Sequence, residues 1–206
     1  MFYFVKTPAL IKKLYPECLW DVKTPENIVY LTFDDGPSPQ VTPFVLDELK
    51  KYNGKATFFC IGKNVKEYFD IYKQVISDGH KPGNHTFNHL NGWRTDDKKY
   101  LEDIKEAANI IDSEFFRPPY GRITKFQIRA LQEEKFKLKT IMWDVLSGDF
   151  DIKVSSENCY LNVVNNVKPG SIIVFHDSVK AFPRLEYALP RVLNFFSEKG
   201  FQFKTL

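Results

Sequence analysis

The chain has 206 residues, long enough for one domain with a sizeable core, and no low-complexity or Pro/Ser/Gly-rich linker divides it. Its 29 basic and 26 acidic residues leave a formal charge of +3 without a block of like charge, which argues against nucleic acid as a partner. Three cysteines, far apart and without C-x-x-C spacing, predict neither a disulfide framework nor a cysteine metal site and are typical of a reducing compartment.

Residues 1–27 are predicted to form an extension that packs on a single domain, residues 28–206. Lysines interrupt the apolar residues of this extension, and nowhere does the chain reach the uncharged run of ~20 residues that a membrane span needs. We therefore expect no signal peptide, no transmembrane segment and a cytoplasmic protein. Leu10, Ile11 and Leu14 could share one face of a short helix, which either packs on the domain, as we favour, or lies on a membrane surface as a peripheral contact.

From residue 28 onward, apolar runs rich in β-branched and aromatic residues alternate with stretches of helical period. The expected strands are residues 28–33, 56–61, 81–84, 115–117, 138–143, 171–176 and 201–204. The expected helices are residues 42–52, 64–79, 96–111, 124–134, 155–166 and 185–199, the second one capped by Asn64 and stopped by Gly79. Helical crossovers between strands predict an α/β fold with a parallel sheet closed into a TIM-like barrel. Functional groups should then follow the strands, at the C-terminal face.

Asp34 and Asp35 directly follow the first expected strand and precede Gly36 and Pro37. Successive side chains of an extended backbone point in opposite directions, so the two carboxylates can take separate tasks at one site. One can bind a metal ion while the other handles a proton. Gly36 permits backbone angles that a Cβ forbids, and Pro37 ends the strand. A plain acidic turn is the alternative interpretation of this stretch taken alone.

His85 and His89 are four residues apart, a spacing that places two imidazoles on one side of a helical turn. Together with Asp35 they would offer a divalent metal ion two nitrogens and one carboxylate, and leave positions open for water and substrate. Zinc fits this set first, with cobalt and nickel as alternatives. His176 ends a later strand, whereas His80 is assigned a structural role.

Residues 117–121, Arg-Pro-Pro-Tyr-Gly, form a rigid turn directly after a strand. The Arg117 guanidinium can hold a carboxylate in bidentate geometry, and the turn can aim a backbone N–H group at an oxyanion. Asp149 follows the strand that ends at Trp143. A carboxylate beside His176 would favour the imidazolium form, which suits a general acid near neutral pH.

The segments TFDDGP, HTFNH, RPPYG, WDVLSGDF and IVFHD, in this order, resemble the NodB-like polysaccharide deacetylases, carbohydrate esterase family 4. The similarity runs from Ile28 to the C-terminus and implies a distorted (β/α)7 barrel. It implies the following roles: Asp34 as general base, Asp35, His85 and His89 as metal ligands, Arg117 as the group that orients Asp34, the Tyr120 N–H as an oxyanion donor, His176 as general acid and Asp149 as its tuning partner. Trp143 and Val174 fall where the family lines its acetyl pocket.

This sequence departs from the family at Phe150, where tryptophan is frequent, at Val174, where leucine is frequent, and at Leu146, where an acid is frequent. These positions shape the groove, so they bear on substrate preference and leave the proton-transfer groups intact. The resemblance implies a metal-dependent hydrolase that removes N-acetyl groups from an N-acetylglucosamine-containing saccharide of chitooligosaccharide or peptidoglycan type. The alternatives are an O-acetyl esterase of acetylated polysaccharide, a hydrolase of small cyclic amides, and a non-catalytic glycan-binding module.

Overall fold

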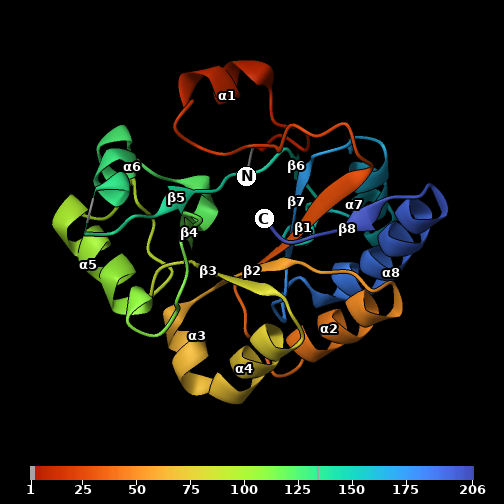
Figure 1. Cartoon of the computed structure of the whole chain (residues 1–206), viewed down its shortest axis with the longest axis horizontal. Coiled ribbons are helices and arrows are strands. Elements are labelled where there is room, and N and C mark those ends of the chain that lie inside the picture. Colours follow the sequence, from red (N-terminus) through yellow and green to blue (C-terminus); the bar gives the residue numbers. More distant parts are fainter. Residues whose placement is uncertain (1–2, 134) are drawn as a thin grey trace.

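The protein folds around one curled parallel sheet (Figure 1); the computed structural model describes residues 3–133 and 135–206. The order along the sheet is β5-β4-β3-β2-β1-β7-β6, and β8 pairs with the beginning of β1. The strands are β1 Ile28–Asp34, β2 Thr57–Cys60, β3 Lys81–Asn84, β4 Phe115–Phe116, β5 Lys139–Thr140, β6 Val145–Leu146, β7 Ile172–His176 and β8 Gln202–Phe203. Every recorded ladder is parallel. The predicted fold, a distorted barrel of β/α units in a single domain, is confirmed.

Helices cover the outside of the sheet (Figure 1). They are α1 Ala9–Leu14, α2 Thr42–Lys51, α3 Gly62–Glu67, α4 Phe69–Ser77, α5 Asp97–Ala108, α6 Lys125–Gln132, α7 Ser156–Val164 and α8 Phe182–Glu198, with a 3₁₀ turn η1 at Pro119–Gly121. Side-chain caps mark the starts of three of them: Asp96 accepts from two N–H groups of α5, Thr124 forms a capping box with Gln127 of α6, and Ser155 accepts from the Asn158 N–H of α7. The predicted end of this last helix, Glu134, lies outside the described residues, as do residues 1 and 2 of the extension.

Strand β1 is buried on both faces, which its nearly continuous apolar sequence predicts. Val29, Leu31 and Phe33 are fully buried and pack in one cluster with α2 and α8, through side chains such as Val45 and Leu189. Burying a side chain of this size contributes about 1.5–3 kcal/mol. The alternate residues, Thr32 and Asp34 among them, therefore face the inside of the barrel.

Two expected elements differ in the structure. The helix expected over residues 64–79 consists of α3 and α4, which meet at Tyr68. Asn64 lies within α3 and caps nothing; its amide donates to the Asp35 carbonyl at 2.8 Å. Helix α3 is thereby hydrogen-bonded to the turn that follows β1.

The strand expected over residues 138–143 is the other difference. Only Lys139–Thr140 joins the sheet, and the strand Val145–Leu146 was not predicted. Beyond Thr140 the chain pairs with the N-terminal segment: the Leu19 N–H donates to the Thr140 carbonyl at 2.9 Å, and the Met142 N–H donates to the Leu19 carbonyl at 2.8 Å. Residues 138–143 thus form backbone hydrogen bonds both with strand β4 and with the N-terminal segment, which is remote in sequence.

The N-terminal segment, residues 3–27, lies between the two end strands of the sheet, β5 and β6 (Figure 1). Lys6 pairs with Val145 in antiparallel fashion, and Asp21 pairs with Ser171. The apolar stripe of α1 does not pack as expected: Ile11 contacts the core, but Leu10 and Leu14 are 68% and 52% exposed. Within residues 3–133 and 135–206, no helix combines the length and the apolar character that crossing a membrane requires.

Candidate metal-dependent active site

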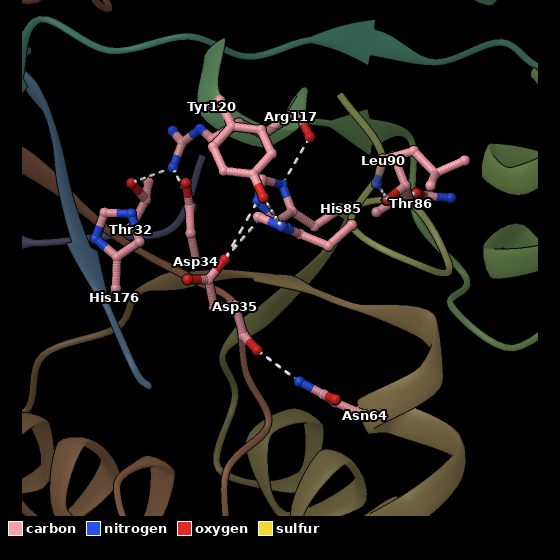
Figure 2. A network of polar contacts seen from close by, with 12 residues as sticks. Thr32, Asp34, Asp35, Asn64, His85, Thr86, Leu90, Arg117, Tyr120 and His176 are labelled. Atoms are coloured by element: carbon pink, nitrogen blue, oxygen red, sulfur yellow. Dashed lines mark hydrogen bonds and ion pairs between the residues drawn. The ribbon is translucent and has the colours of Figure 1, made fainter. Parts of the chain in front are cut away.

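The candidate side chains gather where neighbouring strands end, as expected for a parallel barrel. Asp34 is the last residue of β1 and pairs in register with His176, the last residue of β7. His85 follows β3, Arg117 follows β4, and Asp149 follows β6. Figure 2 shows Asp34 and Asp35 between His176 on one side and His85 on the other.

Asp35, His85 and His89 each offer a ligand atom, and these atoms lie within 4.8 Å of one another. Asp35 Oδ1 is 3.6 Å from His85 Nε2 and 3.1 Å from His89 Nε2. His85 Nδ1 donates to the Arg117 carbonyl at 2.7 Å, which leaves Nε2 as the acceptor that faces Asp35. Burial lowers the pKa of His85 from 6.5 to about 4, so its ring is neutral, as a metal ligand must be. Two imidazoles and one carboxylate fit a divalent first-row cation.

The two histidines do not share a helical turn. Residues 85–89 form a loop in which Thr86 and His89 have φ values of 63° and 56°. Left-handed backbone is strained for residues with a Cβ, and such strain gathers at functional sites. Thr86 is held by its neighbours: its N–H donates to Asn84 Oδ1, and its hydroxyl accepts from the Leu90 N–H. Local hydrogen bonds thus bring the imidazoles together without helical periodicity.

Asp35 likewise departs from the extended backbone that the sequence predicted, with a φ of 79°. Burial alone would raise the pKa of Asp35, but the hydrogen bond with His89 and the charge of His176 outweigh it and lower the pKa. The carboxylate is therefore ionised and ready to bind a cation. Gly36 is needed for close approach rather than for its own φ, because an added Cβ would lie 2.5 Å from the Asp177 Cγ.

Asp34 is held by a buried guanidinium. Arg117 is fully buried and donates from Nη1 to Asp34 Oδ1 at 2.7 Å, so one nitrogen makes the contact and the expected bidentate fork is absent. The same Nη1 donates to the Thr32 hydroxyl at 2.6 Å, and that hydroxyl donates to the Ile173 carbonyl. Thr32 was not predicted as a site residue, although its place two residues before Asp34 on one strand face signals it.

The other nitrogens of Arg117 bond to main-chain carbonyls. Nε donates to Ile141 and Nη2 to Met142, and the guanidinium lies 4.0 Å from the Phe59 ring centroid. A planar group that is hydrogen-bonded through all three of its nitrogens keeps one orientation. The position of Asp34 is thereby fixed from one side of the site.

His176 and Asp149 form a second pair. His176 Nδ1 lies 2.7 Å from Asp149 Oδ1, and the His176 N–H donates to Asp149 Oδ2 at 2.7 Å. Burial lowers the pKa of His176, but the charge and hydrogen bond of Asp149, followed by the charges of Asp35 and Asp34, raise it to about 10. The imidazolium form of His176 is therefore favoured, and Nε2 is the ring nitrogen that Asp149 does not hold. A cation bound nearby would bring this pKa down.

An aromatic wall adjoins this pair. The Phe150 ring lies edge-on to His176 with centroids 5.3 Å apart, and Tyr3 packs on Phe150 at 5.1 Å. Tyr3, which the sequence did not single out, also donates its hydroxyl to Asp151 Oδ2 at 3.3 Å. The N-terminal segment thus reaches the edge of the site, because its pairing with β6 is antiparallel.

Tyr120 closes the opposite side. Its hydroxyl lies 3.1 Å from His89 Nδ1, a contact that the sequence did not predict, and its φ is 60°. Trp143 packs against Gly121, where an added Cβ would lie 2.5 Å from the indole. Val174 shares a strand face with His176, two residues away, and is buried.

Beside Asp35 lies a pocket of about 290 Å³, lined mainly by neutral side chains that include Gln40, Asn64, Tyr68 and Ser178. Hydroxyl and amide groups of this kind suit a hydrogen-bonding ligand such as a sugar. A larger hollow, of about 540 Å³, is lined by α5 with its cap Asp96, by α6 and by the segment after α6, and it contains none of the candidate site residues. Size alone therefore does not identify the site.

The chain is similar to known proteins in sequence and in structure. The sequence profile described as polysaccharide deacetylase matches residues 21–138. A peptidoglycan-N-acetylglucosamine deacetylase of Bacillus cereus is 34% identical over 193 residues, 91% of this chain and 90% of that protein. A chitooligosaccharide deacetylase of Azorhizobium caulinodans is 35% identical over 159 residues, 74% of each chain. A crystal structure of a peptidoglycan N-acetylglucosamine deacetylase with 4-naphthalen-1-yl-N-oxidanyl-benzamide has a TM-score of 0.87 and 31% identity, and the match covers 95% of this chain and 94% of that one.

Proposed function

The chain belongs to the polysaccharide deacetylase family, carbohydrate esterase family 4, and on this basis we propose that it removes N-acetyl groups from an N-acetylglucosamine-containing saccharide of chitooligosaccharide or peptidoglycan type. Relatives named as deacetylases of both substrate types support the proposal. The observation that carries it is the cluster of Asp35, His85 and His89 within 4.8 Å, flanked by Asp34 and His176. The division of the chain at residue 28 stays a prediction, since the profile match begins at residue 21.

Asp35, His85 and His89 would hold one divalent cation, with zinc first and cobalt or nickel as alternatives. Such an ion supplies Lewis-acid polarisation of the acetyl carbonyl and a lowered pKa for a water molecule. The chain prepares its ligands beforehand: the Arg117 carbonyl fixes the tautomer of His85, and the Tyr120 hydroxyl bonds to the outer nitrogen of His89.

Asp34 acts as the general base that takes a proton from the attacking water. Arg117 keeps this carboxylate in one orientation, so that its free oxygen is available. The Tyr120 N–H is the proposed donor to the oxyanion of the tetrahedral intermediate. His176, charged through its pair with Asp149, then gives its Nε2 proton to the departing amine. Trp143, Phe150 and Val174 are the proposed walls of the substrate groove.

The experiment separates metal binding from proton transfer. Asp35→Ala and His89→Ala should lose the bound metal and with it acetate release from an N-acetylglucosamine oligomer. Asp34→Asn should keep the metal and lose about 10²- to 10⁴-fold in kcat, the usual contribution of one general base. Metal analysis and acetate release on the same preparations measure both effects, and full turnover by Asp34→Asn would exclude it as the base.

The same assay, run on acetylated xylan and with the metal removed, distinguishes the alternatives. A deacetylase of amino sugars prefers the N-acetylglucosamine oligomer and stops when the metal is removed. Preference for xylan would identify an O-acetyl esterase, and no release from either substrate would identify a binding module.

A further inference from the structure

Arg184 is a buried cation in an unfavourable place. It is 8% exposed and lies in the first turn of α8, where the N-terminal end of the helix dipole disfavours positive charge. Within residues 3–133 and 135–206, no carboxylate lies within the 4.0 Å that an ion pair requires. Burying a charged group without a counter-ion costs free energy unless hydrogen bonds compensate for it. The hydrogen bonds that Arg184 makes must therefore offset this cost.

These hydrogen bonds join two loops of the site. Arg184 Nε donates to the Asp149 carbonyl at 2.5 Å, and Nη2 donates to the Lys180 carbonyl. Asp149 lies in the loop after β6, and Lys180 lies in the segment between His176 and α8. The planar guanidinium fixes the two carbonyls relative to one another, which a single ammonium cannot do.

Each of these two segments adjoins the proposed proton-donating pair: Asp149 lies in the first, and His176, the last residue of β7, directly precedes the second. The Asp149 carboxylate is fully buried and holds His176 at Nδ1 and at the main-chain N–H, each at 2.7 Å. A shift of the Asp149 backbone would turn the imidazole with it, and misplacement by about 1 Å can cost on the order of 10²-fold in rate.

We propose that Arg184 is a positioning residue for proton transfer by His176: it holds the Asp149 backbone so that the imidazolium Nε2 points at the departing amine. This inference rests on the proposed deacetylase function and assigns Arg184 no contact with the substrate. Loss of Arg184 should therefore slow turnover of a substrate whose leaving group must be protonated. It should leave turnover unchanged when the leaving group needs no proton.

Arg184→Gln is the first test, with an N-acetylglucosamine oligomer as the amide and 4-nitrophenyl acetate as the ester. We expect kcat on the amide to fall roughly 10- to 100-fold, a part of the 10²- to 10⁴-fold that a general acid supplies, and the ester rate to change by less than about 3-fold. Arg184→Lys should lose less on the amide, because its ammonium keeps one of the two hydrogen bonds. An equal fall on both substrates in either variant would overturn the proposal.

Arg191→Gln is the matched control. Arg191 lies on the same helix and donates to the carbonyl four residues earlier, as Arg184 does, but it is exposed, and among the described residues it makes no hydrogen bond to the site. Its amide and ester rates should both stay at the wild-type level. Thermal melts of all three variants show whether a loss reflects unfolding, and Arg184→Lys retains the charge if Arg184→Gln is unstable.

A double-mutant cycle tests the route of the effect. If Arg184 acts through His176, Arg184→Gln should cause no further loss of amide turnover in a His176→Ala background. An additive loss would exclude action through His176. Retention of metal and of some acetate release by the wild type, with no effect of Arg184→Gln, would reject this inference and leave the proposed function standing.

Discussion

At the scale of single residues, the buried carboxyl group of Asp177 affects the stability of the fold in a way that the sequence does not reveal. This carboxyl group is buried beneath Gly36; Oδ2 accepts from the Thr42 hydroxyl at 2.6 Å, and Oδ1 has no recorded partner among the described residues. Burial raises the pKa of Asp177; the Thr42 hydrogen bond lowers it and the charge of Asp35 raises it again, to about 7. The Asp177 carboxyl group therefore stays protonated up to a higher pH in the folded state than in the unfolded state.

A pH dependence follows from this preference. Between pH ~4 and ~7 the folded state binds the Asp177 proton more tightly than the unfolded state, so the free energy of unfolding falls as the pH rises. Asp177→Asn removes the charge and should be more stable, relative to wild type, at pH 8 than at pH 5. Because a tenfold change in proton affinity corresponds to about 1.4 kcal/mol, we expect the difference to change by about 1–4 kcal/mol. Urea unfolding of metal-free protein measures it, and a difference independent of pH would contradict the assignment.

At the scale of elements, the N-terminal segment completes the sheet at β6. The Leu146 N–H donates to the Val5 carbonyl at 2.8 Å, and the Thr7 N–H donates to the Asp144 carbonyl at 2.9 Å. Asp144 is fully buried and accepts from Lys6 at 2.5 Å, Lys12 at 2.7 Å and the Ser171 hydroxyl at 2.5 Å. One carboxylate therefore fastens the segment to the strands beneath it.

Asp144→Asn should loosen this segment. Breaking a fully buried ion pair costs about 3–5 kcal/mol, but Lys6 and Lys12 are 35% and 20% exposed and can turn to water, so we expect a loss of about 1–3 kcal/mol. Hydrogen exchange at Leu146 should accelerate, since its acceptor belongs to the loosened segment. Glu114→Gln, which removes an exposed carboxylate from Lys81 and Lys139, is the control and should change stability by less than about 0.5 kcal/mol. Unchanged exchange at Leu146 in Asp144→Asn would contradict the fastening role.

At the scale of the whole molecule, the proposed metal ligands join two regions of the sheet. Asp35 follows β1 and the histidines follow β3, with β2 between these strands. The apolar cores contain none of these ligands, so we expect the fold to form without the ion. An ion that binds the folded chain alone would stabilise it.

Chelation should therefore lower the melting temperature without unfolding the protein at 25 °C. At a free metal concentration about 100-fold above Kd the linkage is worth about 2.7 kcal/mol, or roughly 5–10 °C for a chain of this size. Melting curves with and without a chelator measure the shift. His89→Ala should show no shift; a shift as large as that of wild type would place the stabilising ion elsewhere.

Short-range patterns in the sequence were sufficient to predict much of the fold and of the candidate site. The alternation of apolar strands with helical periods predicts the parallel sheet, and a parallel sheet necessarily brings Asp34, His85, Arg117 and His176 to one edge. The starts of the helices at Asp96 and Thr124 were also predicted closely, because a cap and the N–H groups that donate to it lie within three residues. The predicted cap Asn64, by contrast, lies within α3.

The tertiary structure decided what depends on partners remote in sequence. The apolar run 138–143 does not reveal that half of it pairs with Leu19, and the spacing of His85 and His89 does not reveal a left-handed loop held by Asn84 and Leu90. The contacts of Gly36 with Asp177, of Tyr3 with Phe150 and of Arg184 with Asp149 each span 35 or more residues. Periodicity and propensity encode which face of an element is buried, whereas the identity of the group across that face is set when the whole chain packs.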